Sequence, residues 1–226
     1  MSYDKSNEFK FWNDSNIVQE FASMQVPEYL IEFFYKSKEV YNKVLDLGCG
    51  GGRNTEMMLN MGFDTYACDY HIKMVEYTKN RISSILPENE LDKRVTQQNM
   101  LDLSFENESF DIVLANGVYH NVSSEELFEK AIMETSKIIK LGGMLYVNMF
   151  SDGYIDSDLS VKAEKYMYQT LDGLDLLLLP QDKVLEIFNK YGLELSEGLY
   201  SYNSKLAVGI RYVVRGAFVK KYNLVL

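Results

Sequence analysis

Four closely spaced glycines stand between an apolar run and a helix-like stretch, an arrangement that can cradle a nucleoside. Residues 44–53 read VLDLGCGGGR, and the glycines are Gly48, Gly50, Gly51 and Gly52. Glycine has no Cβ, so the backbone at these positions can approach a ligand closely. Asp69 ends the next apolar run, FDTYACD. A carboxylate at such a strand end accepts hydrogen bonds from both hydroxyls of a ribose.

The glycine spacing separates two kinds of nucleotide site. A dinucleotide-binding loop has the spacing G-x-G-x-x-G, but Arg53 stands where its third glycine would fall. The spacing here is G-x-G-x-G, with Asp46 two residues before Gly48. NAD enzymes also have an acidic residue at the end of the second strand, so Asp69 alone does not distinguish between the two kinds of nucleotide site. A glycine-rich turn without any ligand is the remaining alternative.

The loop resembles motif I of the class I S-adenosylmethionine-dependent methyltransferases, in which the glycines lie against the methionine and ribose of the cofactor. Three further segments resemble that family: QNMLDLSF at 98–105, SFDIVLA at 109–115 and LGGML at 141–145. The run GGGRN at 50–54 is most similar to small methyltransferases of the tellurite-resistance type. The resemblance implies the fold and the cofactor, and it says little about the substrate.

The same resemblance implies which residues contact the cofactor. S-adenosyl-L-methionine, or the product S-adenosyl-L-homocysteine, is expected to contact Asp46, Gly48, Gly50, Gly52, Arg53, Asp69, Tyr70, Asn99, Met100 and Asn116. The family usually has Asp at the position of Asn99, where it accepts a hydrogen bond from the adenine amino group. An Asn oxygen accepts the same bond more weakly because it carries no charge. Met100 would place its N–H near the adenine or else fill the core, and the carbonyl of Asn116 would touch the methionine amine.

The candidates for catalysis follow the fourth apolar run. Methyl transfer from a sulfonium is a direct displacement that depends on alignment and, for a hydroxyl or a protonated amine, on a base. Tyr119 and His120 lie at that strand end, where sheets of this kind bind ligands. We expect His120 to be a general base or a substrate contact; the alternative is a structural histidine that caps the next helix. The segment offers Asn116 and Asn121 instead of acids, so we expect no metal.

Apolar runs and helical spacings alternate through the first two thirds of the chain. The expected strands are 43–49, 63–68, 94–99, 111–115 and 144–150, and the expected helices are 53–61, 72–86, 124–140 and 181–191. Two final strands, 193–202 and 207–219, are joined by a turn at Asn203-Ser204 and must therefore be antiparallel. The predicted fold class is α/β, a Rossmann-like doubly wound seven-stranded sheet that is mostly parallel with an antiparallel C-terminal strand.

We expect a single methyltransferase domain over 1–226. Its predicted parts are an N-terminal helical cap (1–40), a cofactor-binding core (41–150), a substrate cover (151–180) and a C-terminal helix with antiparallel strands (181–226). The cover is expected to contain a helix at 159–168. Tyrosines 154, 166 and 168 are expected either to line a pocket for the acceptor or only to close the core. Trp12 and Phe21 are expected to lie over the cofactor.

Composition narrows the partners and the compartment. The 226 residues carry a formal charge of −10, with the basic side chains near the C-terminus expected on a solvated strand face. This charge, and the absence of Pro-Pro-Tyr after Asn116, argue against DNA. No run is long enough to span a membrane, and two cysteines without a signal peptide indicate a cytoplasmic protein.

The expected function is therefore transfer of a methyl group to an O or N nucleophile of a small-molecule substrate. The alternatives are a protein or RNA methyltransferase and a non-catalytic S-adenosylmethionine-binding subunit. The oligomeric state stays open.

Overall fold

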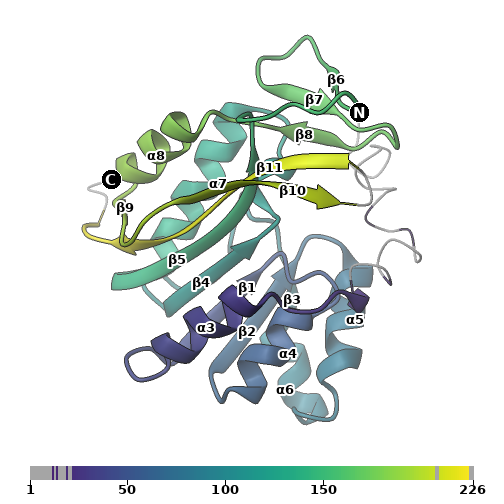
Figure 1. The fold of residues 1–226 in the computed structure, drawn as a ribbon. Coiled ribbons are helices and arrows are strands. Elements are labelled where there is room, and N and C mark those ends of the chain that lie inside the picture. The colour runs from purple at the N-terminus through teal and green to yellow at the C-terminus, as the bar shows by residue number, and fades with distance from the viewer. Residues whose placement is uncertain (1–11, 13, 15–18, 20–21, 207–208, 224–226) are drawn as a thin grey trace.

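The computed structural model of the chain describes residues 12, 14, 19, 22–206 and 209–223 (Figure 1). Its centre is an eight-stranded sheet in the order β10-β11-β5-β4-β1-β2-β3, with β9 paired to β11. The strands are β1 (Lys43–Leu47), β2 (Asp64–Asp69), β3 (Val95–Gln97), β4 (Phe110–Asn116), β5 (Ile139–Ser151), β9 (Leu193–Leu195), β10 (Tyr200–Leu206) and β11 (Gly209–Lys220).

Strands β1 to β5 are parallel to one another, whereas β11 pairs antiparallel with β5, β9 and β10. This arrangement confirms the predicted fold class, and β9 is the additional strand. The carboxyl ends of β1, β2, β4 and β5 therefore meet at one edge of the sheet, which is where folds of this kind bind their ligands.

Helices cover both faces of the sheet (Figure 1). They are α3 (Glu28–Ser37), α4 (Arg53–Asn60), α5 (Ile72–Ile82), α6 (Glu88–Arg94), α7 (Glu125–Ile138) and α8 (Gln181–Lys190), with a short 3₁₀ helix η2 (Tyr119–Asn121). Side chains alternate between the faces of a strand. On β1, Leu45 and Leu47 pack in the cluster of α7 and α8, whereas Val44 packs in the cluster of α3 and α4.

The long helix α7 begins at a side-chain cap, and one short helix was not predicted. The hydroxyl of Ser124 accepts a hydrogen bond from the N–H of Leu127 at 3.3 Å, which satisfies one of the first free donors of α7. Helix α5 ends at Ile82, and α6 then occupies part of the connection that precedes β3. The heptapeptide ENELDKR of α6 buries only Leu91, so its sequence lacks the apolar periodicity that would predict a helix.

The predicted helix at 159–168 is wrong. The cover is a small antiparallel sheet of β6 (Ser160–Val161), β7 (Met167–Gln169) and β8 (Asp175–Leu177). Its apolar residues alternate instead of following a helical period. Leu174, Leu176 and Leu178 pack together in a separate cluster, whereas Leu177 and Leu179 join the main core. The leucine run is therefore buried from both sides.

The predicted turn at Asn203-Ser204 is also misplaced. Both residues lie inside β10, where Asn203 pairs with Tyr212 and Ser204 with Arg211. The last described pair of this hairpin is Leu206 with Gly209. The alternation of polar residues along β10 matches an exposed edge strand, which reads locally like a loop.

The solvated face predicted for the C-terminal basic residues is wrong for three of them. Arg211 and Lys220 are 1% and 3% exposed, and two guanidinium nitrogens of Arg215 are buried. Arg211 makes two hydrogen bonds to Asp158 of the cover, at 2.9 and 2.6 Å. The Lys220 ammonium donates to the carbonyl of Ile139. These cations are structural parts of the C-terminal strands.

Breaking the pair between β11 and the cover is expected to destabilise the protein. Arg211→Met leaves the Asp158 carboxylate, 18% exposed, without its cation, and removal of one partner of a buried pair costs about 3–5 kcal/mol. Urea unfolding should show this loss. The double variant Arg211→Met, Asp158→Leu should lose less, because no charge is left unpaired. A single variant within about 1 kcal/mol of the wild type, where exposed pairs lie, would contradict the role of the pair.

Candidate active site

The glycine loop connects β1 to α4 and leaves one glycine facing open space. Gly48, Gly50 and Gly52 have φ values of 69°, 56° and 78°, a region that favours glycine. A Cβ on Gly48 would meet Val118 at 2.4 Å and one on Gly52 would meet Thr78 at 2.9 Å, but a Cβ on Gly50 would have nothing within 4 Å. The loop is therefore packed on its flanks and open at Gly50.

Asp69 ends β2 directly beside this opening. Its Oδ2 accepts a hydrogen bond from the N–H of Gly50 at 3.0 Å, and its Oδ1 accepts one from the N–H of His71 at 2.9 Å. Burial raises the pKa of Asp69 to about 6, against the backbone hydrogen bonds that lower it. Each carboxylate oxygen has a second lone pair, so the group can still accept from the two hydroxyls of a ribose.

Asp46 supplies an acceptor that no described group satisfies. Its Oδ2 accepts from the Thr55 hydroxyl at 2.6 Å, whereas its Oδ1 is buried without a hydrogen-bond partner. Burial raises the pKa of Asp46 to about 6, and the nearby Arg53 guanidinium lowers it. Buried polar atoms normally have partners, so a carboxylate oxygen left over beside an open glycine loop fits a ligand that brings its own N–H or O–H donors.

The raised pKa values predict that cofactor binding weakens in mild acid. Both carboxyls titrate near 6 in the folded chain, above their ordinary value of about 3.9. Protonation below pH 6 replaces an acceptor lone pair by an O–H, so the affinity for S-adenosylhomocysteine should fall as the pH drops from about 7.5 to 5. Without ligand the contribution of these two carboxyls to stability has the opposite sign: the folded chain takes up their protons before the unfolded chain does, so this contribution rises as the pH falls through 6.

Calorimetric titration at several pH values checks this prediction. In Asp69→Asn one of the two titrating groups is absent, so binding should be weaker and its dependence on pH shallower. An affinity of the wild type that does not change between pH 5 and 7.5 would contradict the assignment of ionised carboxylates to the cofactor.

The other predicted cofactor residues lie around the same edge. Asn99 follows β3, and its Oδ1 accepts from the N–H of Leu101 at 2.9 Å, which holds a tight turn and leaves one lone pair. The Tyr70 carbonyl is fixed by Gln97, and Met100 is half-buried against the main core. Asn116 ends β4 and pairs in register with Asn148 of β5. Their roles toward the cofactor stay predictions.

Tyr119 and His120 are both buried in η2, in different surroundings. Tyr119 is 0% exposed, donates to the Thr135 hydroxyl at 2.8 Å and packs with Phe128, so its geometry favours a packing role. His120 stacks on the ring of Phe150, with centroids 4.1 Å apart, and its Nδ1 accepts the N–H of that residue at 3.2 Å. Burial, with a smaller effect of Arg211, lowers the pKa of His120 to about 3. The neutral ring therefore carries its proton on Nε2.

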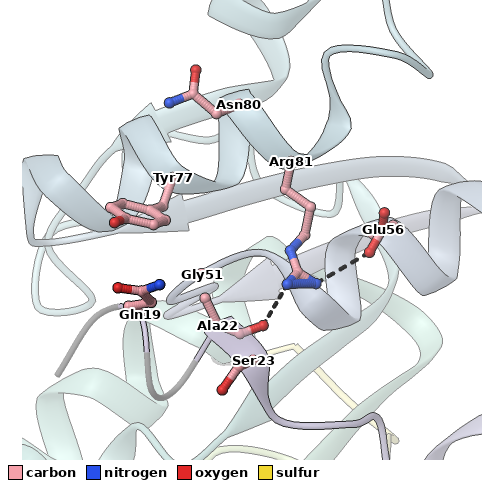
Figure 2. Close-up of a pocket in the computed structure, with 8 residues that line it drawn as sticks. All are labelled: Gln19, Ala22, Ser23, Gly51, Glu56, Tyr77, Asn80 and Arg81. Carbon is pink, nitrogen blue, oxygen red and sulfur yellow. Dashed lines mark hydrogen bonds and ion pairs between the residues drawn. The ribbon is translucent and has the colours of Figure 1, made fainter. Parts of the chain in front are cut away.

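A pocket of about 520 Å³ lies at Gly51 of the glycine loop, and none of the predicted cofactor or catalytic residues lines it (Figure 2). It is lined by the N-terminal segment, α4 and α5, and a Cβ on Gly51 would meet the Cα of Ala22 at 2.7 Å. Arg81 donates to the Ala22 carbonyl and to Glu56. The hydrogen bond from Arg81 and the close approach of Gly51 both involve Ala22, so this residue holds the N-terminal segment against the glycine loop. Trp12 packs against the cover cluster, and Phe21 lies outside the described residues.

Three residues of this region were missed by the sequence analysis. Tyr29 of α3 accepts a hydrogen bond from the Asn148 amide at 3.0 Å, and Thr55 holds Asp46. Thr55 could have been found, because it falls in the first turn of the helix that follows the glycine loop. The contact between Tyr29 and Asn148 joins residues 119 apart in sequence and has no local signal.

Residues 45–147 match the family model of the methyltransferase domain. This range contains the glycine loop, Asp69 and the segment around His120. These residues form a methyltransferase domain. S-adenosylmethionine is the cofactor that such a domain takes, and the open Gly50, Asp69 and the unsatisfied oxygen of Asp46 fit it. The finer resemblance to the tellurite-resistance type stays a prediction.

Individual relatives differ in what they methylate. The chain is 27% identical over 118 residues to a probable tRNA methyltransferase 9B of Mus musculus, covering 52% of this chain and 24% of that protein. It is 33% identical over 105 residues to a ubiquinone biosynthesis O-methyltransferase of Brucella ovis, covering 46% and 40%. The chain thus spans less than half the length of these two relatives.

A solved methyltransferase shares the fold over nearly the whole chain. The 1,6-didemethyltoxoflavin-N1-methyltransferase of Burkholderia thailandensis, with bound 1,6-didemethyltoxoflavin and S-adenosylhomocysteine, has a TM-score of 0.67 at 15% identity and covers 95% of this chain and 85% of its own. At this identity the likeness concerns the fold of the methyltransferase domain and not its substrate.

The described residues also bear on metals and membranes. Among residues 22–206, 209–223 and the isolated described positions, no three His, Cys, Asp or Glu side chains are grouped so that they could hold a metal ion. The expectation of a metal-free site remains a prediction. In the same part of the chain, no helix combines the length and the apolar character needed to cross a membrane.

Proposed function

We propose that the chain transfers the methyl group of S-adenosylmethionine to an O or N nucleophile of a small molecule. The observation that carries the proposal is the cover, because β8 packs against η2, the segment that follows the carboxyl end of β4. The cover is fixed there: Ser151 donates to the Leu179 carbonyl, and the Ile210 N–H donates to Asp156. A cover packed this close to the cofactor edge of the sheet is better suited to enclosing a metabolite than to binding a macromolecule.

The displacement itself needs alignment more than acid or base chemistry. The glycine loop, Asp69 and Asp46 hold the cofactor, which supplies the activated methyl group when bound. His120 lies under the cover, and its neutral ring presents an Nε2–H, because Nδ1 already accepts from Phe150. We assign His120 the role of a donor that orients the acceptor, in preference to a general base.

Substitutions at His120 separate these roles. His120→Ala should lower kcat/KM for the acceptor by about tenfold or more, the worth of a hydrogen bond of about 1.5 kcal/mol, with S-adenosylhomocysteine affinity unchanged within about twofold. His120→Gln keeps an N–H donor and should recover part of the activity. A Gln variant as inactive as Ala would favour a base, and two fully active variants would show that the histidine only packs.

A second candidate is methylation of RNA. The similarity to a probable tRNA methyltransferase 9B favours it, although the match covers only 52% of this chain. The net charge of −10 opposes attraction to a polyanion. Protein methylation and a non-catalytic binding subunit have no specific observation in their favour. A cytoplasmic location is also part of the proposal, since both cysteines, Cys49 and Cys68, are buried and unpaired.

A transfer assay with methyl-labelled S-adenosylmethionine distinguishes these functions. The protein is incubated separately with a metabolite extract, total tRNA and a protein extract, each with a heat-inactivated enzyme control. We expect label in a low-mass product of the metabolite fraction. Label confined to tRNA or to protein would replace the proposal by the corresponding alternative, and no label in any fraction would favour a binding subunit.

A further inference from the structure

We propose that Arg215 holds an anionic group, a carboxylate or a phosphate, of the methyl acceptor. This inference rests on the proposed transfer to a small molecule and adds a chemical class to the substrate. It concerns a site on β11, outside the motifs of the cofactor loop. Its support comes from where Arg215 lies, what surrounds it and what it lacks.

The register of the sheet places Arg215 beside the cofactor edge. Asn116 of β4 pairs with Asn148 of β5, and Asn148 pairs with Arg215 of β11. Each of these residues is two positions from Leu114, Tyr146 or Ala217 on its own strand, so its side chain lies on the same face of the sheet. Leu114, Tyr146 and Ala217 pack on the α3 side. The three polar side chains therefore form one row on one face, leading from the end of β4 toward the edge of the sheet.

Tyrosine rings surround the guanidinium of Arg215 where a protein anion would be expected. Its Cζ lies 3.6 Å from the ring centroid of Tyr29, 4.9 Å from that of Tyr200 and 5.6 Å from that of Tyr202. Its Nε and Nη1 are buried without a hydrogen-bond partner. A buried donor without an acceptor is costly, above all in a charged group, so these two nitrogens still need hydrogen-bond acceptors.

The neighbouring basic residues show what Arg215 lacks. Arg211, four residues earlier on β11, is paired with Asp158, and Lys220 donates to a carbonyl. Among the residues that the structure describes, no acid forms an ion pair with Arg215, although the chain has 33 acids and only 23 basic residues. Guanidinium forks match carboxylate and phosphate oxygens in geometry and charge. A ligand anion would therefore complete this site.

The surroundings also give a ligand a way in and connect the site to the cofactor. Tyr200 and Tyr202 are 56% and 37% exposed, so the cluster opens toward solvent at the β10 edge. On the inner side, Tyr29 interacts electrostatically with Arg215, and Arg53 interacts electrostatically with both Tyr29 and Asp46. An acceptor anchored at Arg215 by its anion would thus lie next to the polar groups around the cofactor loop.

Small anions test the site without knowledge of the natural acceptor. Benzoate, phenyl phosphate and neutral benzamide are titrated by ligand-observed NMR against the full chain, with and without S-adenosylhomocysteine. We expect benzoate or phenyl phosphate to bind and benzamide not to bind. The stronger of the two anions identifies the group as a carboxylate or a phosphate. In Arg215→Gln the anion affinity should fall at least tenfold, while S-adenosylhomocysteine affinity stays within twofold.

Two further variants keep the test decisive. Lys205→Gln removes the same charge from an exposed position on β10 and should leave anion binding unchanged. Arg215→Lys keeps the charge without the fork and should bind the anions more weakly than the wild type, which decides the question if Arg215→Gln does not fold. Absence of anion binding, equal binding of benzamide, or unchanged binding in either Arg215 variant would overturn the proposal. If the wild type itself does not bind S-adenosylhomocysteine, the proposed function is refuted instead.

Discussion

Gly50→Ala is expected to weaken cofactor binding strongly while the chain remains folded. The residue has φ 56°, and the added Cβ meets no protein atom within 4 Å, so it would point into the opening beside Asp69. A side chain in the left-handed region costs about 1–2 kcal/mol, which a domain of ordinary stability tolerates. The methyl group would occupy space that the cofactor needs, so calorimetry with S-adenosylhomocysteine should show an affinity reduced by about a hundredfold or more, some 2.7 kcal/mol.

Gly142→Ala is the matched control. Gly142 has φ 78° and also has nothing within 4 Å of an added Cβ, but it lies near the start of β5, where the pairing with β4 shifts register, at the end of the sheet opposite the loop. Both variants should lose similar stability, and only Gly50→Ala should lose the cofactor. Equal cofactor affinities of the two variants would contradict the assignment of the open side of Gly50 to the ligand.

Asp69→Ala is expected to weaken S-adenosylhomocysteine binding by at least tenfold. The substitution removes the acceptor of both ribose hydroxyls, and hydrogen bonds to a charged group are worth about 1.5–3 kcal/mol each. It also releases the N–H groups of Gly50 and His71, which loosens the loop. The affinity is measured by calorimetry, and circular dichroism checks that the fold is retained.

Asp92→Ala controls for the removal of a carboxylate. The Asp92 side chain is 78% exposed and forms only a surface ion pair with Lys79, which is worth little. It should bind the cofactor like the wild type. If Asp69→Ala behaves in the same way, the carboxylate of Asp69 does not hold the ribose.

The cofactor half of the site could be predicted from sequence because its residues are close along the chain. Asp69 and Gly50, which are hydrogen-bonded, are 19 residues apart and are joined by one strand–helix–strand unit. Apolar runs bounded by glycines identified β1, β2 and β4, and the strand-end rule then placed their polar residues at one edge. The parallel direction of these strands follows from the alternation of strands and helices.

The acceptor half could not be predicted, since it is assembled from distant segments. Tyr29 meets Asn148 across 119 residues, and Arg211 meets Asp158 across 53. Neither contact has a local pattern, so the C-terminal cations were read as solvated. The strands of the cover were missed for a similar reason: its leucine run is buried from two sides, and only the tertiary structure provides the second side.

Calorimetric titration of the wild type with S-adenosylhomocysteine and with NAD tests the central claim most directly. The G-x-G-x-G loop, the open Gly50 and the Asp69 carboxylate predict one S-adenosylhomocysteine bound per chain, with no heat from NAD. Saturable binding of NAD, with no response to S-adenosylhomocysteine, would contradict the account.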